Sequence, residues 1–339
     1  MRGQAERTVG RTVERTAARV VRFGDPSAIA LAHETLHAPR GNEVLVRVTH
    51  AALGSTDVLA RRGGYVLQPL PGFVPGYDFV GVLETESAVS AALGLRTGAR
   101  VAGVLPRMGA HTTRLVVSPT FLVAVPDALT SEAAAALPLN GVTAALALQY
   151  AGDARSVLIQ GITGAVGSLA AQLALRDGRT VLGTGTTPPP GLTAPDVTLV
   201  DYRDPRWPAS VRSQTAGGVD AAIDHTGSPL VREAVAPSGV IVRTAFAGRP
   251  GHERDDAVRG SAAAAMRRFG HPREIVCSVP FWVLRKRPEY RRMLRGLFAD
   301  MAAGRLTVFE PEVMAFDTVW AAHRAADARP AGRTIVLGM

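Results

Sequence analysis

Hydrophobic and polar residues follow two different patterns in the first and second parts of the chain. Up to about residue 126 the apolar positions form short stretches, such as residues 43–48, and glycine and proline separate these stretches. Alternation with a period of two is typical of strands with one buried face, and glycine and proline favour turns. We therefore expect an antiparallel, loop-rich β domain from Arg19 onwards.

From about residue 130 the rhythm changes. Thr130 and Glu132 open an alanine-rich segment that has the signals of a helix start. Six short apolar stretches then alternate with helical or looping segments, and we predict a strand at each: residues 156–160, 180–184, 197–200, 219–224, 240–244 and 274–278. This alternation is typical of a doubly wound parallel sheet, as in a Rossmann domain.

The C-terminal part adds an arginine-rich helix and a last strand. Five apolar residues recur at helical spacing and predict a buried stripe: Tyr290, Leu294, Leu297, Phe298 and Met301. We expect Arg291, Arg292 and Arg295 on the solvated side of this helix. Residues 334–337 form an apolar run that we expect to return as a strand to the first domain.

Composition agrees with two globular domains. The chain has 339 residues, 47% hydrophobic and 20% charged, and no apolar run approaches the roughly 20 residues of a membrane span. Residues 1–18 lack the apolar stretch of a secretory signal, so we expect a disordered extension and a cytoplasmic protein. Cys277 is the only cysteine, which excludes disulfides and thiolate-rich zinc sites.

The net charge of +9 comes almost entirely from arginine, because Lys286 is the only lysine. Nucleic-acid binding is the function class that such a charge suggests first. The densest arginine run is already explained as the solvated face of a helix, however, and it lacks a stripe of interleaved aromatic residues. We therefore predict no nucleic-acid and no membrane partner, and a small-molecule substrate.

A glycine-rich turn follows the first predicted strand of the second domain. Residues 157–167 pass from an apolar strand through Gly161, Gly164 and Gly167, and we predict a helix at 168–176. In a dinucleotide site, Gly164 would let the backbone approach a pyrophosphate and Gly167 would let the helix pack on the strand. The alternative is a tight strand-to-helix turn that binds no ligand.

With this GxxGxxG turn, the chain resembles the quinone oxidoreductase branch of the medium-chain dehydrogenases/reductases over residues 19–339. The resemblance rests on separated motifs at residues 41–48, 57–65, 75–82, 161–167, 201–203 and 332–337. It implies a GroES-like, mainly antiparallel substrate domain at 19–127 and 280–339, split around a Rossmann domain at 128–279. It also implies a homodimer paired through the last Rossmann strand.

The resemblance further implies a reductase that uses a nicotinamide cofactor. The residues predicted to contact this cofactor are Asn140, Thr143, Gly161, Thr163, Gly164, Ala165, Val166, Gly167, Thr184, Gly185, Thr186, Thr187, Tyr202 and Phe246. No acid follows the second strand, which favours NADP(H) over NAD. No lysine or arginine follows it either, so the threonine hydroxyls or the more distant Arg203 would have to bind the 2′-phosphate.

The chain departs from the family at two further places. Zinc-dependent relatives carry cysteine or histidine ligands where this sequence has residues 54–57 and 76–78, so we predict no metal. Three prolines at 188–190 exclude the usual helix between the second and third strands, because proline removes backbone donors and clashes with the preceding turn. The adenosine end of the cofactor would then be weakly held.

Three side chains are the candidates for catalysis. Tyr65 matches the family's tyrosine and would donate a proton; the alternative is a tyrosine that packs in a turn. Asp57 matches an acid of the family, but we favour a helix-capping role for it. Tyr77 would face the substrate, whereas His225 is left out as a histidine at a strand end.

These residues predict an NADPH-dependent, zinc-free reductase of an activated C=C bond in an enone, enoyl group or quinone, in a reductive tailoring or cyclisation step of a biosynthetic pathway. The alternative is a non-redox descendant of the fold, either a cofactor-independent cyclase or a binding protein. The proline loop and the absent cation motivate that alternative.

Overall fold

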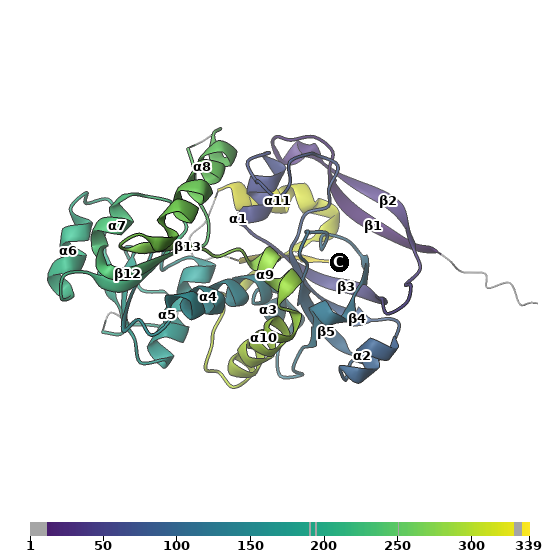
Figure 1. Ribbon diagram of the computed structural model, residues 1–339. Coiled ribbons are helices and arrows are strands. Elements are labelled where there is room, and N and C mark those ends of the chain that lie inside the picture. The colour runs from purple at the N-terminus through teal and green to yellow at the C-terminus, as the bar shows by residue number, and fades with distance from the viewer. Residues whose placement is uncertain (1–11, 190, 194, 250, 329–333) are drawn as a thin grey trace, which may run out of the picture.

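The computed structural model describes residues 12–189, 191–193, 195–249, 251–328 and 334–339. Two halves, each with a large sheet, lie side by side, and short helices together with α4 and α10 lie between them (Figure 1). The helices of this central region are α3 (Ser131–Ala135), α4 (Pro138–Ala151), α9 (Val279–Arg285) and α10 (Arg287–Ala302). Among the described residues, no helix combines the length and the apolar character needed to span a membrane.

A seven-stranded sheet forms the core of the first half. The strands follow the order β14–β15–β3–β4–β5–β7, and β6 also pairs with β3. The strands are β3 (Val44–Leu53), β4 (Asp78–Leu83), β5 (Arg100–Val104), β6 (Arg114–Val117), β7 (Leu122–Ala124), β14 (Pro311–Ala315) and β15 (Thr334–Gly338). All pairs are antiparallel except β14 with β15. The predictions of an antiparallel first domain and of a returning C-terminal strand are confirmed.

Three helices belong to this half. They are α1 (Ser55–Arg61), α2 (Ala88–Ala92) and α11 (Val319–Asp327). α1 follows β3 directly and packs against α11, so residues 319–327 lie next to the helix that carries Asp57.

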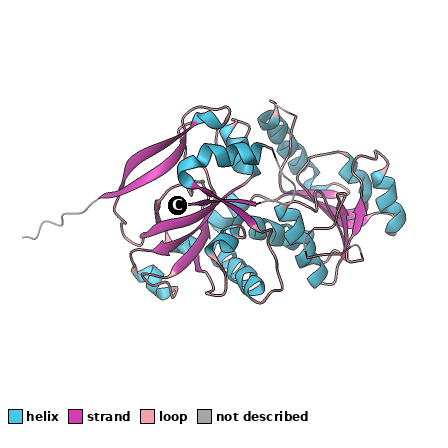
Figure 2. Ribbon diagram, turned by 180° about the vertical axis from the view of Figure 1, so that it is seen from behind, coloured by secondary structure: helices cyan, strands magenta, loops and turns pink. Residues whose placement is uncertain are grey.

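A two-stranded ribbon corrects one prediction. β1 (Thr12–Val20) pairs with β2 (Ile29–His37) along its whole length, and the ribbon projects from the first half (Figure 2). Residues 12–18, expected to be disordered, are therefore a strand, because their alternating pattern finds an antiparallel partner and Ala17 and Ala18 are fully buried. Residues 1–11, the rest of the predicted extension, lie outside the described residues.

The second half is a doubly wound domain, as predicted. Six parallel strands follow the order β10–β9–β8–β11–β12–β13. They are β8 (Ser156–Ile159), β9 (Thr180–Thr184), β10 (Thr198–Val200), β11 (Val219–Asp224), β12 (Val235–Arg243) and β13 (Arg273–Val276), and each overlaps a predicted strand. The exact boundaries of the two domains remain a prediction.

Helices cover both faces of this parallel sheet. α4 and α5 (Ala165–Arg176) pack on one face, and α6 (Trp207–Gln214) and α7 (Leu230–Ala234) pack on the other. Alternate residues of β8 serve the two faces: Val157 joins the core beneath α4 and α5, whereas Leu158 joins the core that contains Trp207. Strands buried on both faces explain why the sequence shows continuous apolar runs there.

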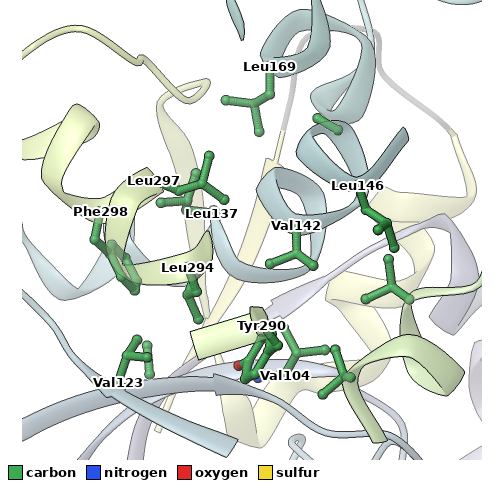
Figure 3. Packing of buried hydrophobic residues seen from close by; sticks show 14 of the residues in the cluster. Val104, Val123, Leu137, Val142, Leu146, Leu169, Tyr290, Leu294, Leu297 and Phe298 are labelled. Carbon is green, nitrogen blue, oxygen red and sulfur yellow. The ribbon is translucent and has the colours of Figure 1, made fainter. Parts of the chain in front are cut away.

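One apolar core connects the two halves. Tyr290, Leu294, Leu297 and Phe298 of α10 pack between Val104 and Val123 of the antiparallel sheet and the side chains of α4, as Figure 3 shows. This confirms the predicted apolar stripe of the arginine-rich helix.

Arg291 corrects the prediction for the opposite face of the same helix. It is only 7% exposed, and its Nη1 donates to the carbonyl oxygens of Pro119 and Leu122, at 3.0 and 2.6 Å. Sequence spacing could not anticipate this, because the turn before β7 and the first residue of β7 supply carbonyl acceptors where the spacing alone indicates solvent. Arg292 and Arg295 are exposed as expected.

Candidate functional site

The glycine turn between β8 and α5 has no room for larger residues. Gly161 has a φ of +64°, which favours glycine. A Cβ atom on Gly167 would lie 2.3 Å from the carbonyl oxygen of Gly161, so α5 can pack this closely on the strand only with glycine at this position. The second observation agrees with the predicted role of Gly167, which is to let the helix pack on the strand.

Ile162 explains why this turn departs from a GxGxxG pattern. Its side chain is fully buried and occupies the space over β9, where a Cβ on Gly183 would lie 2.4 Å from Ile162 Cδ1. The chain thus compensates for isoleucine in the turn with glycine in the neighbouring strand.

The start of α5 has the features of a phosphate site. Gly164 is the exposed N-cap residue, and Thr163, Ala165 and Val166 around it are half-buried. The first N–H groups of a helix have no partners within the helix and favour anions. The turn therefore fits the phosphates of a dinucleotide.

The predicted threonines of the second strand divide into two groups. The Thr184 hydroxyl accepts from Gly161 N at 2.8 Å and donates to Gln160 Oε1 at 3.1 Å, and the residue is only 2% exposed. Its hydroxyl is therefore committed to holding the turn on β9 and is not available to a 2′-phosphate. Gly185 is buried, whereas Thr186 and Thr187 are exposed just beyond the strand.

The connection after these threonines has the predicted form. Among the described residues between β9 and β10 there is no helix. The prediction that no helix forms between the second and third strands is therefore confirmed for the described part of that segment.

Asp201, Tyr202 and Arg203 follow β10, next to these threonines. The Arg203 guanidinium binds both carboxylate oxygens of Asp201, with Nε–Oδ1 and Nη2–Oδ2 distances of 2.9 and 2.7 Å. Hydrogen bonds from Arg203 lower the pKa of Asp201 to about 2. Tyr202 is 59% exposed beside this pair.

Phe246 lies on the other side of the turn, after β12. Its ring packs against Gly227 and Gly260, and a Cβ on Gly260 would lie 2.4 Å from the ring. Gly260 belongs to α8 (Glu253–Met266). His225, which follows β11, lies against Gly161.

Tyr65 and Tyr77 form a hydrogen-bonded pair. Their hydroxyl oxygens are 2.8 Å apart, and their rings meet edge to face. Tyr77 is 2% exposed, whereas Tyr65 is half-buried. Burial raises the pKa of Tyr65 to about 12 and raises that of Tyr77 further, so both phenols stay protonated at neutral pH.

Asp57 holds the backbone that carries this pair. Its Oδ2 accepts from Gly54 N at 2.9 Å, which caps α1, and its Oδ1 accepts from Gly76 N at 2.7 Å, immediately before Tyr77. The capping interpretation is confirmed. Because both carboxylate oxygens bind backbone, Asp57 is a positioning residue and its assignment to the catalytic group is not supported.

Asn140 and Thr143 lie on α4, shortly after Leu139. Leu139 packs against the apolar cluster that contains Tyr65 and Tyr77. Asn140 Nδ2 donates to Ala136 O at 3.0 Å and Thr143 Oγ1 donates to Leu139 O at 2.7 Å, so both side chains bind backbone carbonyls about one turn earlier. The structure thus brings Tyr65 and Tyr77 together, and the start of α4 packs against them through Leu139.

Asp78 is a buried carboxyl that the sequence analysis missed as a site residue. It follows Tyr77 directly, and its Oδ2 accepts from Leu139 N at 2.8 Å, linking β4 to α4. Burial raises the pKa of Asp78 to about 8. Its position in an apolar strand was the signal that could have identified it.

A second missed group lies at the ends of β11 to β13. Arg243 Nη1 binds Asp224 Oδ2 at 2.5 Å, Arg243 Nε binds Glu274 Oε2 at 3.0 Å, and all three residues are at most 2% exposed. Asp224 also accepts from Thr226 N and Gly227 N, at 3.0 and 2.8 Å. This network therefore fixes the loop that carries His225 and the glycine beneath Phe246.

Comparisons with known proteins agree with this architecture. Residues 40–127 match the alcohol dehydrogenase GroES-like domain family. The chain is 33% identical over 200 residues to the zebrafish synaptic vesicle membrane protein VAT-1 homolog, covering 56% of this chain and 40% of that protein. It is 30% identical over 176 residues to pig quinone oxidoreductase, covering 51% of this chain and 53% of that enzyme. The matches thus span about half the length of these relatives or less.

Solved structures share the fold over nearly the whole chain. The JamJ enoyl reductase superposes with a TM-score of 0.80 at 18% identity, covering 96% of this chain and all of that chain. The CurF enoyl reductase-type cyclopropanase of curacin A biosynthesis gives a TM-score of 0.76 at 19% identity, covering 96% and 99%. The GroES-like match, the partial similarity to quinone oxidoreductases and the shared fold make the chain similar to the medium-chain dehydrogenases/reductases, with quinone oxidoreductases and enoyl reductases among its neighbours.

Proposed function

We propose that this protein is an NADPH-dependent, zinc-free reductase that acts on a C=C bond conjugated to a carbonyl, as in an enone, an enoyl group or a quinone. The observation that carries the proposal is the Tyr65–Tyr77 pair, which packs through Leu139 against the start of α4. Two protonated hydroxyls next to the start of α4 support the proposal, because Asn140 on this helix is the residue proposed to bind the nicotinamide.

The residues that would hold the cofactor belong to four segments. The start of α5 from Gly164 would hold the pyrophosphate. Thr186 and Thr187, together with the residues after β10, would hold the adenosine end. Phe246 would flank the nicotinamide half, and Asn140 would bind the carboxamide. When bound, the nicotinamide supplies the hydride. The chain itself must bind the substrate oxygen, exclude water and deliver a proton.

Tyr65 is the hydroxyl placed to deliver that proton. Tyr77 is the more deeply buried member of the pair, so its O–H can donate to Tyr65 Oη while the Tyr65 O–H points to the substrate oxygen. A hydrogen bond to that oxygen stabilises the enolate that hydride addition to the alkene produces. Asp57 contributes indirectly, because it fixes Gly76 and hence the backbone of Tyr77.

Cofactor binding is the first test. Calorimetry should detect binding of NADPH to the purified protein at about micromolar Kd, near 8 kcal/mol, and NADPH should then be consumed with a simple quinone or enone. Absence of binding of both NADPH and NADH would contradict the proposal and favour the non-redox alternative.

That alternative, a cofactor-independent cyclase or a binding protein, has one specific observation in its favour. The described part of the β9–β10 connection has no helix, and no lysine or arginine lies between Thr184 and Asp201 to bind a 2′-phosphate. One solved structure of the same fold is the cyclopropanase of curacin A biosynthesis, so a biosynthetic cyclisation step also fits this architecture.

We further propose a cytoplasmic homodimer. β13 is an edge strand of its sheet, and Val276, Phe281 and Leu284 next to that edge are 40–50% exposed. An open strand edge beside exposed apolar side chains favours pairing with a second copy. Light scattering after size-exclusion chromatography should give twice the chain mass of 35.6 kDa.

A further inference from the structure

The residues after β10 lie beside the exposed threonines after β9. Val200 pairs with Thr184, and Gly185 N donates to Val200 O at 3.1 Å, so the two strands end at the same level. Ligands of open parallel sheets bind beyond the carboxyl ends of the strands. Asp201, Tyr202 and Arg203 therefore border the same edge of the sheet as Thr186 and Thr187.

Arg203 is the one cation that the sequence supplies to this edge. No other lysine or arginine occurs from Gly183 to Pro205. The Arg203 side chain is 66% exposed but is held by Asp201, whose side chain is 45% exposed. Asp201 could accept a hydrogen bond from a ribose hydroxyl, and Arg203 could bind a phosphate. In the structure these two side chains bind each other instead.

We propose that Asp201 and Arg203 form the nucleotide-selecting pair of the cofactor site. NADPH binds when its 2′-phosphate replaces the Asp201 carboxylate on Arg203, whereas NADH binds when its ribose hydroxyl donates to Asp201. Tyr202, exposed between them, offers a face for the adenine. This inference rests on the proposed function, because it assigns the adenosine end of the same site.

Replacement of Asp201 by the 2′-phosphate on Arg203 costs little free energy, because ion pairs between exposed side chains contribute little to stability. A 2′-phosphate carries a charge of roughly −1.5 to −2, against −1 for a carboxylate, so it competes well for the guanidinium. Asp201 remains nearby and repels the phosphate. The pair therefore predicts weak discrimination, with Kd values for NADPH and NADH within about tenfold of each other, unlike a site with an unopposed arginine.

The test measures Kd values of both nucleotides, by calorimetry, for the full chain and three variants. Asp201→Asn removes the competing charge and can keep the hydrogen bond that Arg203 N donates to Asp201 Oδ1 at 3.0 Å. Arg203→Met removes the cation. Asp204→Asn is the matched control, because Asp204 is also an exposed acid that pairs with the arginine two residues ahead, through a single Arg206 Nε–Asp204 Oδ1 contact of 3.4 Å.

We expect Asp201→Asn to tighten NADPH binding several-fold and to weaken NADH binding, and Arg203→Met to weaken NADPH binding by about tenfold or more with little effect on NADH. Asp204→Asn should change neither Kd by more than about twofold. The Kd values of adenosine 2′,5′-bisphosphate and AMP should change in the same way as those of NADPH and NADH. This result would restrict the effect to the adenosine end of the cofactor. Thermal unfolding confirms that each variant is folded.

Two results overturn the inference in distinguishable ways. If the native chain binds nucleotides but the NADPH-to-NADH ratio of Asp201→Asn and Arg203→Met stays within twofold of the native ratio, the pair does not select and the proposed function stands. If the native chain binds neither nucleotide, the proposed function fails and the selecting pair fails with it.

Discussion

The hydroxyl oxygens of Tyr65 and Tyr77 lie 2.8 Å apart, which joins a half-buried phenol to a fully buried one through a single hydrogen bond. Tyr65 comes from the loop after α1 and Tyr77 directly precedes β4, so the pair ties two segments of the antiparallel half together. Burial keeps both phenols protonated, which makes the pair a proton donor rather than a base.

Replacement of the outer phenol should impair turnover. We expect Tyr65→Phe to lower kcat by about 10² to 10⁴, the usual contribution of a positioned proton donor, with an unchanged Kd for NADPH. Tyr77→Phe should lower kcat by about tenfold, because Tyr65 keeps its own O–H. Steady-state kinetics with a simple enone measure both effects.

Tyr150→Phe, on α4, is the control and should leave kcat unchanged. The raised pKa also predicts that activity does not fall through tyrosine ionisation between pH 8 and pH 10, because the pKa of Tyr65 is about 12. Full activity of Tyr65→Phe would remove the phenol from the mechanism.

The packing of Ile162 against Gly183 predicts a stability effect. Gly183→Ala should lower the free energy of unfolding by about 1–3 kcal/mol, because the new methyl group overlaps the buried isoleucine and β9 must shift. Gly296→Ala on α10 is the matched control. Nothing lies within 4 Å of its Cβ, so it should be neutral or stabilising by up to about 1 kcal/mol. Equal denaturant midpoints for the two variants would contradict the role of Gly183.

The buried network of Arg243 should be sensitive to loss of its cation. Arg243→Met leaves Asp224 and Glu274 without their shared partner, and we expect a loss of about 3–5 kcal/mol in unfolding free energy. Arg305→Gln, which breaks an exposed pair with Asp300, should cost at most about 1 kcal/mol. Chemical denaturation of both variants provides the comparison, and similar losses would show that burial adds nothing to this network.

His323 should make the protein sensitive to acid. It is fully buried on α11 beside His111, and neither ring nitrogen has a hydrogen-bond partner among the described residues. Burial lowers the pKa of His323 well below 6.5. The unfolded chain therefore binds the proton more tightly than the folded chain. This contribution to stability is complete above about pH 6.5 and is lost progressively as the pH falls below it.

His323→Leu should flatten the decline of Tm between pH 7 and pH 5. His252→Gln, at an exposed histidine, should not flatten it. An identical slope for the native chain and His323→Leu would exclude His323 as the source of acid sensitivity.

The sequence by itself determined the elements and their class. The period-two stretches, the alternation of strands and helices and the three glycines of the turn depend on local backbone preferences and on which face of an element is buried. These are properties of neighbouring residues, so each predicted Rossmann strand corresponds to one in the structure. The prolines at 188–190 likewise predicted a connection without a helix.

The tertiary structure decided which side chains meet, because partners far apart in sequence supply the acceptors, the charges and the burial. Arg291 is buried because Pro119, just before β7, and Leu122, at the start of β7, offer carbonyl oxygens. The Thr184 hydroxyl forms hydrogen bonds with Gln160 and Gly161. The Asp57 carboxylate accepts hydrogen bonds from two backbone amides. Only the folded chain brings Tyr65 to Tyr77, since a sequence pattern carries no information on the distance between two loops.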